Sequence, residues 1–462
     1  MSVVPWVRLC YNDKKHKEAF SMKIGYSRID ITPTQPVPLA GYGNTSRRIS
    51  QNVLSPLCSA CIVLTDEAGS TAMLIHNDLI SSPDWFADPI RQAIEEATGV
   101  PFENIVIHAT HTHSAPDINN KAEPGIPPYI EMVKQKLVEN AVAAMEDRKL
   151  VTSAEMAKAY TKGLNFVRHY VLEDGSYKGD NFGDLNPSPY AGHTTEADNE
   201  MRLVKFHLAG AEDVLLCNWQ THPHRTGGGK KYDISADIVG VMRDEMEAAL
   251  GCKFIYFSGA GGNVNPRSRI ARENVTADYL EQGKALARYA LDAERGYEPL
   301  ALGAVRVEHR KIWADLNRPD PKLLEGSRLV FDHWLKTNDF RACCEMAAPY
   351  GINSPYAAGN FIRRSECKDA GYYYPFTAIS LGDLAFVSVP YEMFDTNAKY
   401  VREQSPFKLT VVASCCNDAN GYVPSAYGYI HGCYEADCSL CKPGSGERFA
   451  YAMVRMLEDL KK

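Results

Sequence analysis

The feature that most constrains the fold of this chain is the alternation of two kinds of segment. Short apolar runs typical of buried strands alternate with longer segments whose apolar residues recur with the helical period. The strand-like runs are "ACIVLTD", "STAMLIHNDLI", "NIVIHATHTH", "LLCNWQTH", "KFIYFSGAGG", "LAFVSVPYEMF" and "KLTVVASCCND". The clearest helical segments are "WFADPIRQAIEEATG", "PYIEMVKQKLVENAVAAMEDRK", "IVGVMRDEMEAALG" and "TADYLEQGKALARYALDAER". This alternation predicts an α/β fold in which mixed sheets are layered with helices.

Composition, charge and the absence of linker-like stretches predict the domain number, partners and location of this chain of 462 residues. No linker-like stretch or short repeat interrupts residues 22–462, which are predicted to form one domain; residues 1–21 are expected to be an extension outside it. The net charge of −7 comes without long runs of one sign, which argues against a nucleic-acid partner. No apolar stretch approaches the ~20 residues of a membrane span. An N-terminus unlike a secretory signal and an odd number of cysteines, 13, predict a cytoplasmic protein with reduced thiols.

Polar residues cluster where the strand-like runs end, the place where α/β proteins assemble their sites. Two of these clusters contain histidines spaced by two, His111 with His113 and His222 with His224. On a strand this spacing puts both imidazoles on one face, where they can share a zinc ion or divide into a ligand and a catalytic group. Either pair alone is more often an ordinary hydrogen-bonded feature. Two such pairs, each at the end of a predicted strand, favour a metal site.

A carboxylate is the next ligand to expect, because zinc sites combine nitrogen and oxygen donors. Glu392 ends the apolar run "LAFVSVP", where an unpaired carboxylate would be costly to bury. The alternative reading is a solvated glutamate at the start of the helix "FDTNAKYVREQ".

The sequences of these stretches, and their order along the chain, resemble those of the neutral (non-lysosomal, alkaline-type) ceramidases and their bacterial homologues. "GYSRIDITP" and "AGYGN" match the opening strand and Gly-Tyr turn of that family, and "HNDLI" follows. "THTHSAP" corresponds to THTHSGPGG, "NWQTHP" to NWFAVHP or NFACHP, "ISADIVG" to ISADYPG, and "GAGGNVNPR" to GAAGDVNPR or GDVSPN. "VPYEMF" and "GYVPSAYGYIHGCYEADC" complete the set, which spans about residues 24–445.

The resemblance implies a zinc-dependent hydrolase that cleaves a linear amide in a small-molecule substrate. It implies that one zinc ion, Zn²⁺, is held by His111, His222, Glu392 and Tyr422. The catalytic residues that it implies around the reacting carbonyl are His113, Tyr434 and, on a shorter match, Arg168. Tyr434 lies twelve residues after Tyr422, as the second tyrosine of the family motif does. Asp78 is expected to orient one of the ligands.

One departure from the family concerns the nucleophile. Asn265 occupies the position of the serine in GDVSPN, and Asn263 that of the aspartate. An amide is not a nucleophile, so an acyl-serine route is excluded at this position. A water activated by the metal is the expected nucleophile, with Asn265 donating a hydrogen bond to the water or the oxyanion.

Other departures concern the substrate. "APDI" replaces the expected GPGG, and the chain ends soon after the last motif, so a C-terminal immunoglobulin-like domain is not expected. Three polar residues are predicted to bind substrate: His224, Arg225 and Arg267. Together with Lys230, Lys231 and Arg269 they favour a small polar or anionic substrate over a lipid. Two alternatives stay open: an esterase, lactonase or lyase acting on a sugar-like substrate, and a metal-containing binding protein without turnover.

The cysteines of "CYEADCSLC" add one further ambiguity. Cys438 and Cys441 have the CxxC spacing of a zinc or redox site, with Cys433 close by. No fourth ligand stands near them in the sequence, so free thiols are the favoured interpretation.

Overall fold

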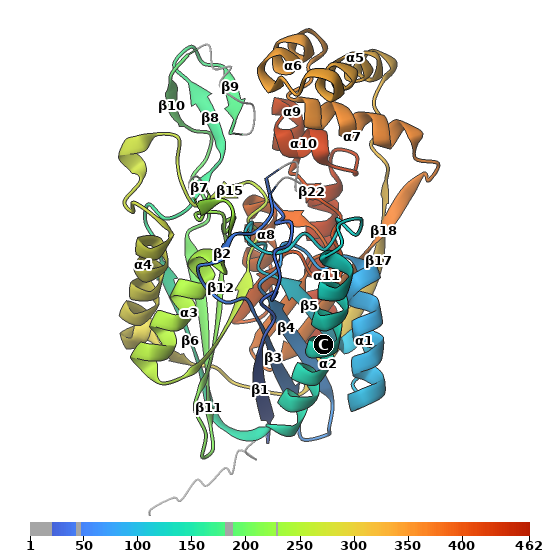
Figure 1. The fold of residues 1–462 in the computed structure, drawn as a ribbon. Coiled ribbons are helices and arrows are strands. Elements are labelled where there is room, and N and C mark those ends of the chain that lie inside the picture. Colours follow the sequence, from blue (N-terminus) through green and yellow to red (C-terminus); the bar gives the residue numbers. More distant parts are fainter. Residues whose placement is uncertain (1–20, 43–47, 181–187, 228–229) are drawn as a thin grey trace, which may run out of the picture.

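The computed structural model describes residues 21–42, 48–180, 188–227 and 230–462 (Figure 1). The predicted extension over residues 1–21 lies outside the described residues except for its last residue. None of the described helices is long and apolar enough to cross a membrane.

A nine-stranded mixed sheet forms the first half of the core. In order across it lie β14 (Lys253–Ser258), β12 (Val214–Trp219), β11 (Glu200–Leu208), β6 (Lys149–Tyr160), β1 (Lys23–Asp30), β3 (Cys58–Thr65), β4 (Thr71–Asn77) and β5 (Ile105–Ala109), with β16 (Glu298–Pro299) beside β6. The pairs β12–β14 and β4–β5 are parallel. Every other pair in this sheet is antiparallel.

A four-stranded sheet packs against the first one. Its order is β17 (Val305–Asp315), β18 (Gly371–Leu381), β19 (Leu384–Ser388) and β21 (Leu409–Ala413), with β19 and β21 parallel. One apolar cluster joins the facing surfaces, with Ile62 and Val204 from the large sheet and Phe386 and Val411 from the small one. Burial of both faces explains why these strands are near-continuous apolar runs.

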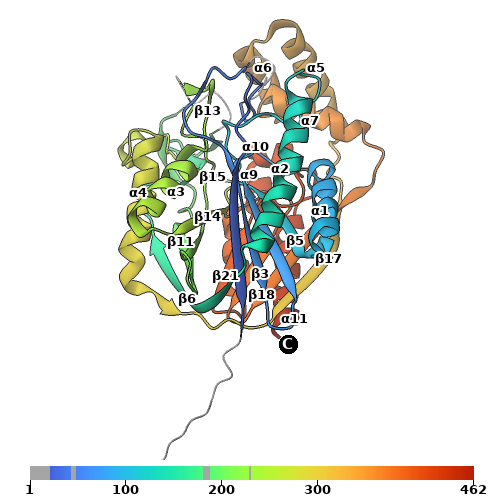
Figure 2. The same ribbon diagram turned by 60° about the horizontal axis from the view of Figure 1, so that its bottom comes forward.

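Helices cover the outer faces of both sheets (Figures 1 and 2). The large sheet is covered by α1 (Asp84–Thr98) and α2 (Ile126–Glu146) over one half, and by α3 (Asp237–Leu250) and α4 (Tyr279–Asp292) over the other. The small sheet is covered by α8 (Asp395–Glu403) and α11 (Ser445–Lys461). The result is a layered α/β fold, which confirms the predicted fold class. All seven predicted strands and all four predicted helices are present.

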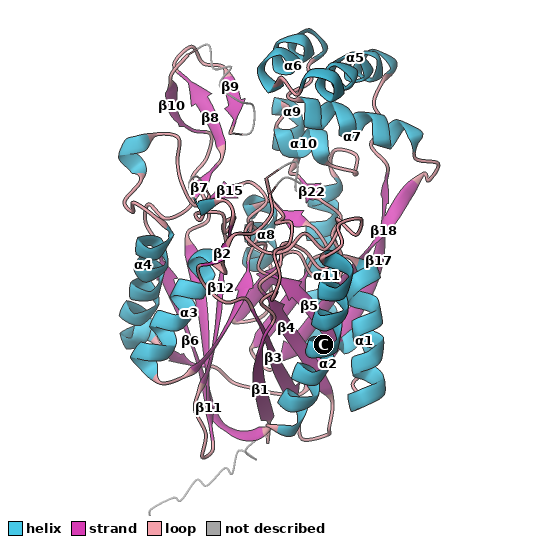
Figure 3. Cartoon of the chain, viewed as in Figure 1, coloured by secondary structure: helices cyan, strands magenta, loops and turns pink. Residues whose placement is uncertain are grey.

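A third group of elements lies above the strand ends (Figure 3). Three helices, called here the helical cap, are α5 (Pro321–Thr337), α6 (Phe340–Ala347) and α7 (Pro355–Glu366). They share a small apolar core of their own. Beside the cap lie α9 (Ala426–His431), α10 (Tyr434–Cys438) and a small sheet of β8 (His169–Leu172), β9 (Tyr177–Gly179) and β10 (Tyr190–His193). The cap lies outside the elements predicted from the sequence.

Candidate metal centre

The four predicted ligands all follow strands that end at the same edge of the fold. His111 follows β5, His222 follows β12, Glu392 follows β19 and Tyr422 follows β21. Each of these strands belongs to a parallel pair. Carboxyl ends of parallel strands lie side by side, so the loops that leave them converge on one place.

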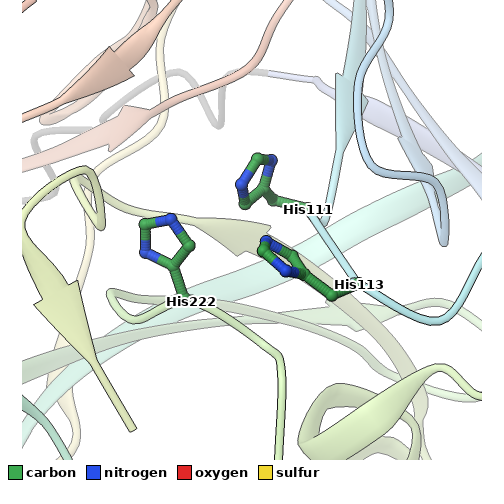
Figure 4. Close-up of side chains that lie close together, drawn as sticks. All are labelled: His111, His113 and His222. Atoms are coloured by element: carbon green, nitrogen blue, oxygen red, sulfur yellow. The ribbon is translucent and has the colours of Figure 1, made fainter. Parts of the chain in front are cut away.

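The polar atoms of the four side chains converge in that place. Nε2 of His111 and Nε2 of His222 lie 3.3 Å and 3.1 Å from Oε2 of Glu392. Oη of Tyr422 lies 3.5 Å from Nε2 of His222. His113 completes a tight group of three imidazoles, whose candidate ligand atoms all lie within 4.8 Å of one another (Figure 4).

Backbone carbonyl groups fix which imidazole nitrogen faces the centre. Nδ1 of His111 donates to the carbonyl of Ile80 at 2.7 Å, and Nδ1 of His222 donates to that of Val264 at 3.1 Å. Because a carbonyl only accepts, both Nδ1 atoms carry a proton, and both Nε2 atoms face Glu392.

The residue expected to orient a ligand has another role. Asp78 is buried and pairs with His76 at 3.2 Å and with Arg243 at 3.0 Å. The ring of His111 is held by the carbonyl of Ile80 instead. The expectation for Asp78 is therefore wrong in this structure.

A short parallel ladder holds the two remaining candidate ligands side by side. Strand β20 (Glu392–Met393) pairs with β22 (Tyr422–Val423), with Glu392 directly opposite Tyr422. The backbone N–H of Glu392 donates to the carbonyl of Gly421 at 2.8 Å. Residues separated by thirty positions in the sequence are thus fixed in one register.

The backbone at His111 is in the left-handed region, with φ of 70°. A residue with a Cβ atom adopts this conformation rarely and at a cost of about 1–3 kcal/mol. Its amide N–H donates to the carbonyl of Leu79 at 2.9 Å, which holds the turn in place. The turn directs the His111 ring toward Glu392, away from the line of β5.

The electrostatics of this group favour a positive charge beside Glu392. Burial lowers the pKa of His222 to about 4, so its imidazole is neutral. At His111 burial is the largest single influence and acts in the same direction, but the Glu392 carboxylate and Cys415 together outweigh it and raise the pKa well above its usual value. In the absence of another cation, the Glu392 carboxylate therefore keeps the His111 imidazole protonated.

The residues fit a divalent transition metal. Oε2 of Glu392 is buried between Nε2 of His111 and Nε2 of His222, and no other described residue donates a hydrogen bond to it. Two imidazole nitrogens, a carboxylate and a phenol oxygen are the donor types that zinc and similar ions prefer. A metal ion would replace the proton as the partner of Glu392, and the Nε2 atoms of His111 and His222 would bind it.

A cavity of about 990 Å³ opens beside this centre. It is lined by five of the residues that the sequence predicted as catalytic or substrate-binding: His113, Arg168, His224, Asn265 and Tyr434. Arg225 donates instead to the carbonyl of Thr276, and Arg267 is exposed; neither is among the described residues that line the cavity.

His113 has no hydrogen-bond partner among the described residues at either ring nitrogen, although both atoms are buried. Burial and the neighbouring His111 lower its pKa well below the usual value. Its ring centroid lies 5.1 Å from that of His111 and 5.6 Å from that of His222. The side chain is therefore a neutral imidazole at the border between the centre and the cavity.

Arg168 is locked in the wall of the cavity by three groups. Its Nη2 donates to the carbonyl of Gly262 at 2.8 Å, its Nε donates to Glu435, and its guanidinium carbon lies 5.4 Å from the ring centroid of Tyr422. Glu435 also accepts from His169 at 3.0 Å. Tyr434 precedes Glu435 and packs on Tyr422 with a centroid separation of 5.9 Å.

Asn265 belongs to a chain of polar side chains that also line the cavity. Its Oδ1 accepts from Nε2 of His224 at 3.1 Å, and its Nδ2 donates to Asp180. Asp180 in turn pairs with Arg269. Sequence reasoning missed Asp180, which stands in "YKGD" without a motif, and Glu435, which directly follows the predicted Tyr434.

Among the described residues none of the three cysteines of "CYEADCSLC" forms a disulfide. Cys441 donates to Oη of Tyr374 at 3.0 Å, whereas Cys438 accepts from Nδ2 of Asn360 at 3.0 Å. Cys433 is buried beside His169 and Glu435. The favoured interpretation as free thiols stays a prediction.

Comparisons with known proteins identify the fold. No protein-family model and no curated protein sequence matches this chain. Among solved structures, the neutral ceramidase from Pseudomonas aeruginosa is similar, with a TM-score of 0.72 and 14% identity over 96% of this chain and 75% of that chain. A ceramidase solved as a complex with C2 has a TM-score of 0.68, with the same identity and coverage. The resemblance seen in the motifs thus extends to the fold.

Proposed function

We propose that this protein is a metal-dependent hydrolase that uses one zinc ion to cleave a linear amide in a small polar or anionic substrate. The observation that carries the proposal is the convergence of His111, His222, Glu392 and Tyr422 beside a cavity of about 990 Å³ that Tyr422 lines. The similarity in fold to ceramidases, which is distant, adds to it.

The metal would supply two things: it would lower the pKa of a water toward ~7 and polarise the carbonyl that the water attacks. The surrounding residues would transfer the protons and stabilise the developing charge. His113 is placed to take the proton that the water loses and to pass it to the leaving nitrogen, since both of its ring nitrogens lack other partners. The new bond joins the water oxygen to the carbonyl carbon, the carbon–nitrogen bond breaks, and an acid and an amine result.

Negative charge develops on the carbonyl oxygen during this attack. Tyr434 remains a protonated hydroxyl donor, because the nearby sulfur of Cys438 and burial raise its pKa well above the usual value. Arg168 brings a fixed positive charge to the same wall, held there by Gly262 and Glu435. Preorganised donors of this kind contribute most in a site that excludes water.

A direct test combines metal analysis with a panel of N-acyl substrates. We expect about one zinc per chain, loss of amide hydrolysis after chelation and its recovery when zinc is returned. Short polar N-acyl compounds should be better substrates than long-chain ceramide, because charged side chains such as Asp180 and Arg269 line the cavity. Full activity in metal-free protein, or a kcat/KM for long-chain ceramide above about 10⁴ M⁻¹s⁻¹, would contradict the proposal.

The polar side chains that line the cavity also fit an alternative function, the cleavage of an ester. The same residues would stabilise attack on an ester or lactone carbonyl, which has a better leaving group. Matched amide and ester substrates with the same acyl part distinguish the two, since only an amidase retains a substantial rate on the amide.

A further inference from the structure

The arginines that line the large cavity differ in their partners. Arg168 pairs with Glu435, and Arg269 pairs with Asp180. Arg363, on α7 of the helical cap, forms no ion pair with a carboxylate within the described ranges. Its guanidinium donates to Oδ1 of Asn360. One cation of the cavity wall is therefore free to bind an anion.

Asn360 fixes where this guanidinium lies. It stands one turn before Arg363 on α7, so both side chains share a face of the helix. Its Nδ2 donates to Sγ of Cys438 at 3.0 Å, which leaves Oδ1 for Arg363. The amide thus links the cap to α10, next to Tyr434.

Arg363 stands where two cavities meet. The large cavity of about 990 Å³ and a neighbouring one of about 390 Å³ are both lined by Asn360, Arg363, Tyr422 and Tyr434. Tyr422 is a candidate ligand, and Tyr434 is the proposed hydroxyl donor. A molecule whose reacting carbonyl lies at the metal centre would therefore extend along α7 toward Arg363.

The cap also supplies an apolar wall beside Arg363. Phe331 of α5 and Tyr356 and Ile362 of α7 line the same cavity. Gly359 permits this arrangement, because a Cβ atom there would lie 2.9 Å from Cε2 of Phe331. The wall thus offers an aromatic and aliphatic surface next to a cation.

We infer that Arg363 binds a carboxylate of the substrate, so that the substrate class is an N-acylated amino acid with an apolar side chain. The inference rests on the proposed function for the position of the amide. The fork of a guanidinium matches a carboxylate with two parallel hydrogen bonds. Arg168 and Arg269 are already paired with Glu435 and Asp180. Among the described arginines that line the cavity, this leaves Arg363 for a singly charged ligand.

The test compares a charged and a neutral substrate of the same shape. Release of butyrate is measured from N-butyryl-phenylalanine and from its carboxamide, using zinc-loaded full-length protein. For the wild type we expect kcat/KM to favour the acid by about 10- to 100-fold, the usual range for one charge-assisted pair of hydrogen bonds. Arg363→Gln should bring this ratio close to one, mainly through KM, and Arg363→Lys should retain part of it.

Arg341→Gln is the matched control. Arg341 is an exposed arginine of α6 that pairs with Glu345, and it does not line the cavity. This variant should keep the wild-type ratio. Arg363 is itself exposed, so its replacement leaves the packing of the cap intact.

A binding measurement separates this inference from the proposed function. N-butanesulfonyl-phenylalanine and its carboxamide have the same shape but cannot be hydrolysed, and their Kd values are measured by calorimetry. The role of Arg363 would be overturned if acid and carboxamide had equal rates and equal Kd values. It would also be overturned if the preference for the acid were unchanged in Arg363→Gln. Both results would leave the proposed hydrolysis unaffected. A preference in Kd that disappears in Arg363→Gln, without butyrate release from either compound, would support Arg363 and overturn the proposed function.

Discussion

The two histidines of the THTH motif are only two residues apart, yet their surroundings differ. His111 has its Nδ1 fixed by the carbonyl of Ile80 and its Nε2 facing Glu392, whereas His113 has no hydrogen-bond partner among the described residues. We expect His111→Ala to lose metal and activity together, because removing a ligand breaks the site. We expect His113→Ala to keep its metal and lose turnover by about 10²- to 10⁴-fold, the usual contribution of a general acid or base.

Metal content by atomic spectroscopy, measured beside the hydrolysis rate, checks both variants. The three imidazoles are close enough for all of them to be ligands. An empty site in His113→Ala would show that both members of the motif bind the metal.

Asp437 on α10 gives a second prediction at the scale of one residue, concerning pH. Burial raises the pKa of this carboxyl to about 7, although Asn353 donates to it and Arg364 is near. The native state then holds a proton that the unfolded chain, with an aspartate pKa of ~3.9, has released. The free energy of unfolding should therefore fall as the pH rises from about 4 to about 7, and this contribution should be constant above that.

Asp437→Asn removes this titration and keeps an oxygen that accepts from Asn353. We expect the variant to gain stability over the wild type as the pH rises to 8, by roughly 1–4 kcal/mol. Denaturant unfolding at pH 5, 7 and 8.5 measures the difference. Asp332→Asn, at an exposed position of α5, is the control and should follow the wild type. Parallel pH profiles for wild type and Asp437→Asn would contradict the assignment.

Among the elements, the short β20–β22 ladder depends on a close approach of the loop after β14. The N–H of Gly262 donates to the carbonyl of Met393 at 2.8 Å. A Cβ atom at Gly262 would lie 2.7 Å from the carbonyl oxygen of Glu392, which is too close for the backbone to stay in place. Gly262→Ala should push the ladder outward and move the Glu392 carboxylate away from the two imidazoles.

We expect Gly262→Ala to weaken metal binding about 10- to 100-fold, in line with the 1–3 kcal/mol of typical overpacking. Competition with a chelator of known affinity measures the change. Gly192→Ala is the control, because a Cβ atom there meets nothing within 4 Å. An unchanged metal affinity in Gly262→Ala would mean that the ladder tolerates displacement.

The elements also show what the sequence could predict. The strands and helices of the layers were predicted because their apolar periods match the faces they bury. The cap was missed, although Asp320, Asp339 and Ser354 each cap the start of one of its helices and Pro321 and Pro355 occupy first helical positions. Those signals are local, and the cap helices bury only a small apolar core of their own.

For the site, the motifs predicted which loops meet, but not the contacts that orient the side chains. The carbonyl groups of Ile80 and Val264 carry no side-chain signature, so their hydrogen bonds to His111 and His222 could not be read from residue types. Asp180 and Arg363 lie outside every motif and reach the cavity only through the tertiary fold. Loop conformation and long-range packing decide these placements.

At the scale of the whole molecule, metal binding should stabilise the fold. The candidate ligands come from segments attached to both sheets, so the ion would link two layers that otherwise meet through apolar packing. A ligand that binds only the native state at 100 times its Kd adds about 2.7 kcal/mol. We therefore expect chelation to lower the melting temperature by roughly 2–5 °C and zinc to restore it.

His111→Ala supplies the control for this prediction. Its melting temperature should no longer respond to chelator or zinc, because the site is broken. A wild-type melting temperature that is the same with and without chelator would contradict a structural contribution from the metal.

The positions of the four candidate ligands along the chain also bear on how the protein matures. His111 and His222 belong to loops of the large sheet, whereas Glu392 and Tyr422 belong to loops of the small one. A nascent chain that has emerged from the ribosome only as far as the large sheet offers imidazoles but no carboxylate partner. The complete set exists only after β21 has joined β19 and carried Tyr422 beside Glu392. If the four residues bind a metal, the chain can take it up only late in biosynthesis, and we expect a product truncated before Glu392 to be unable to hold the ion.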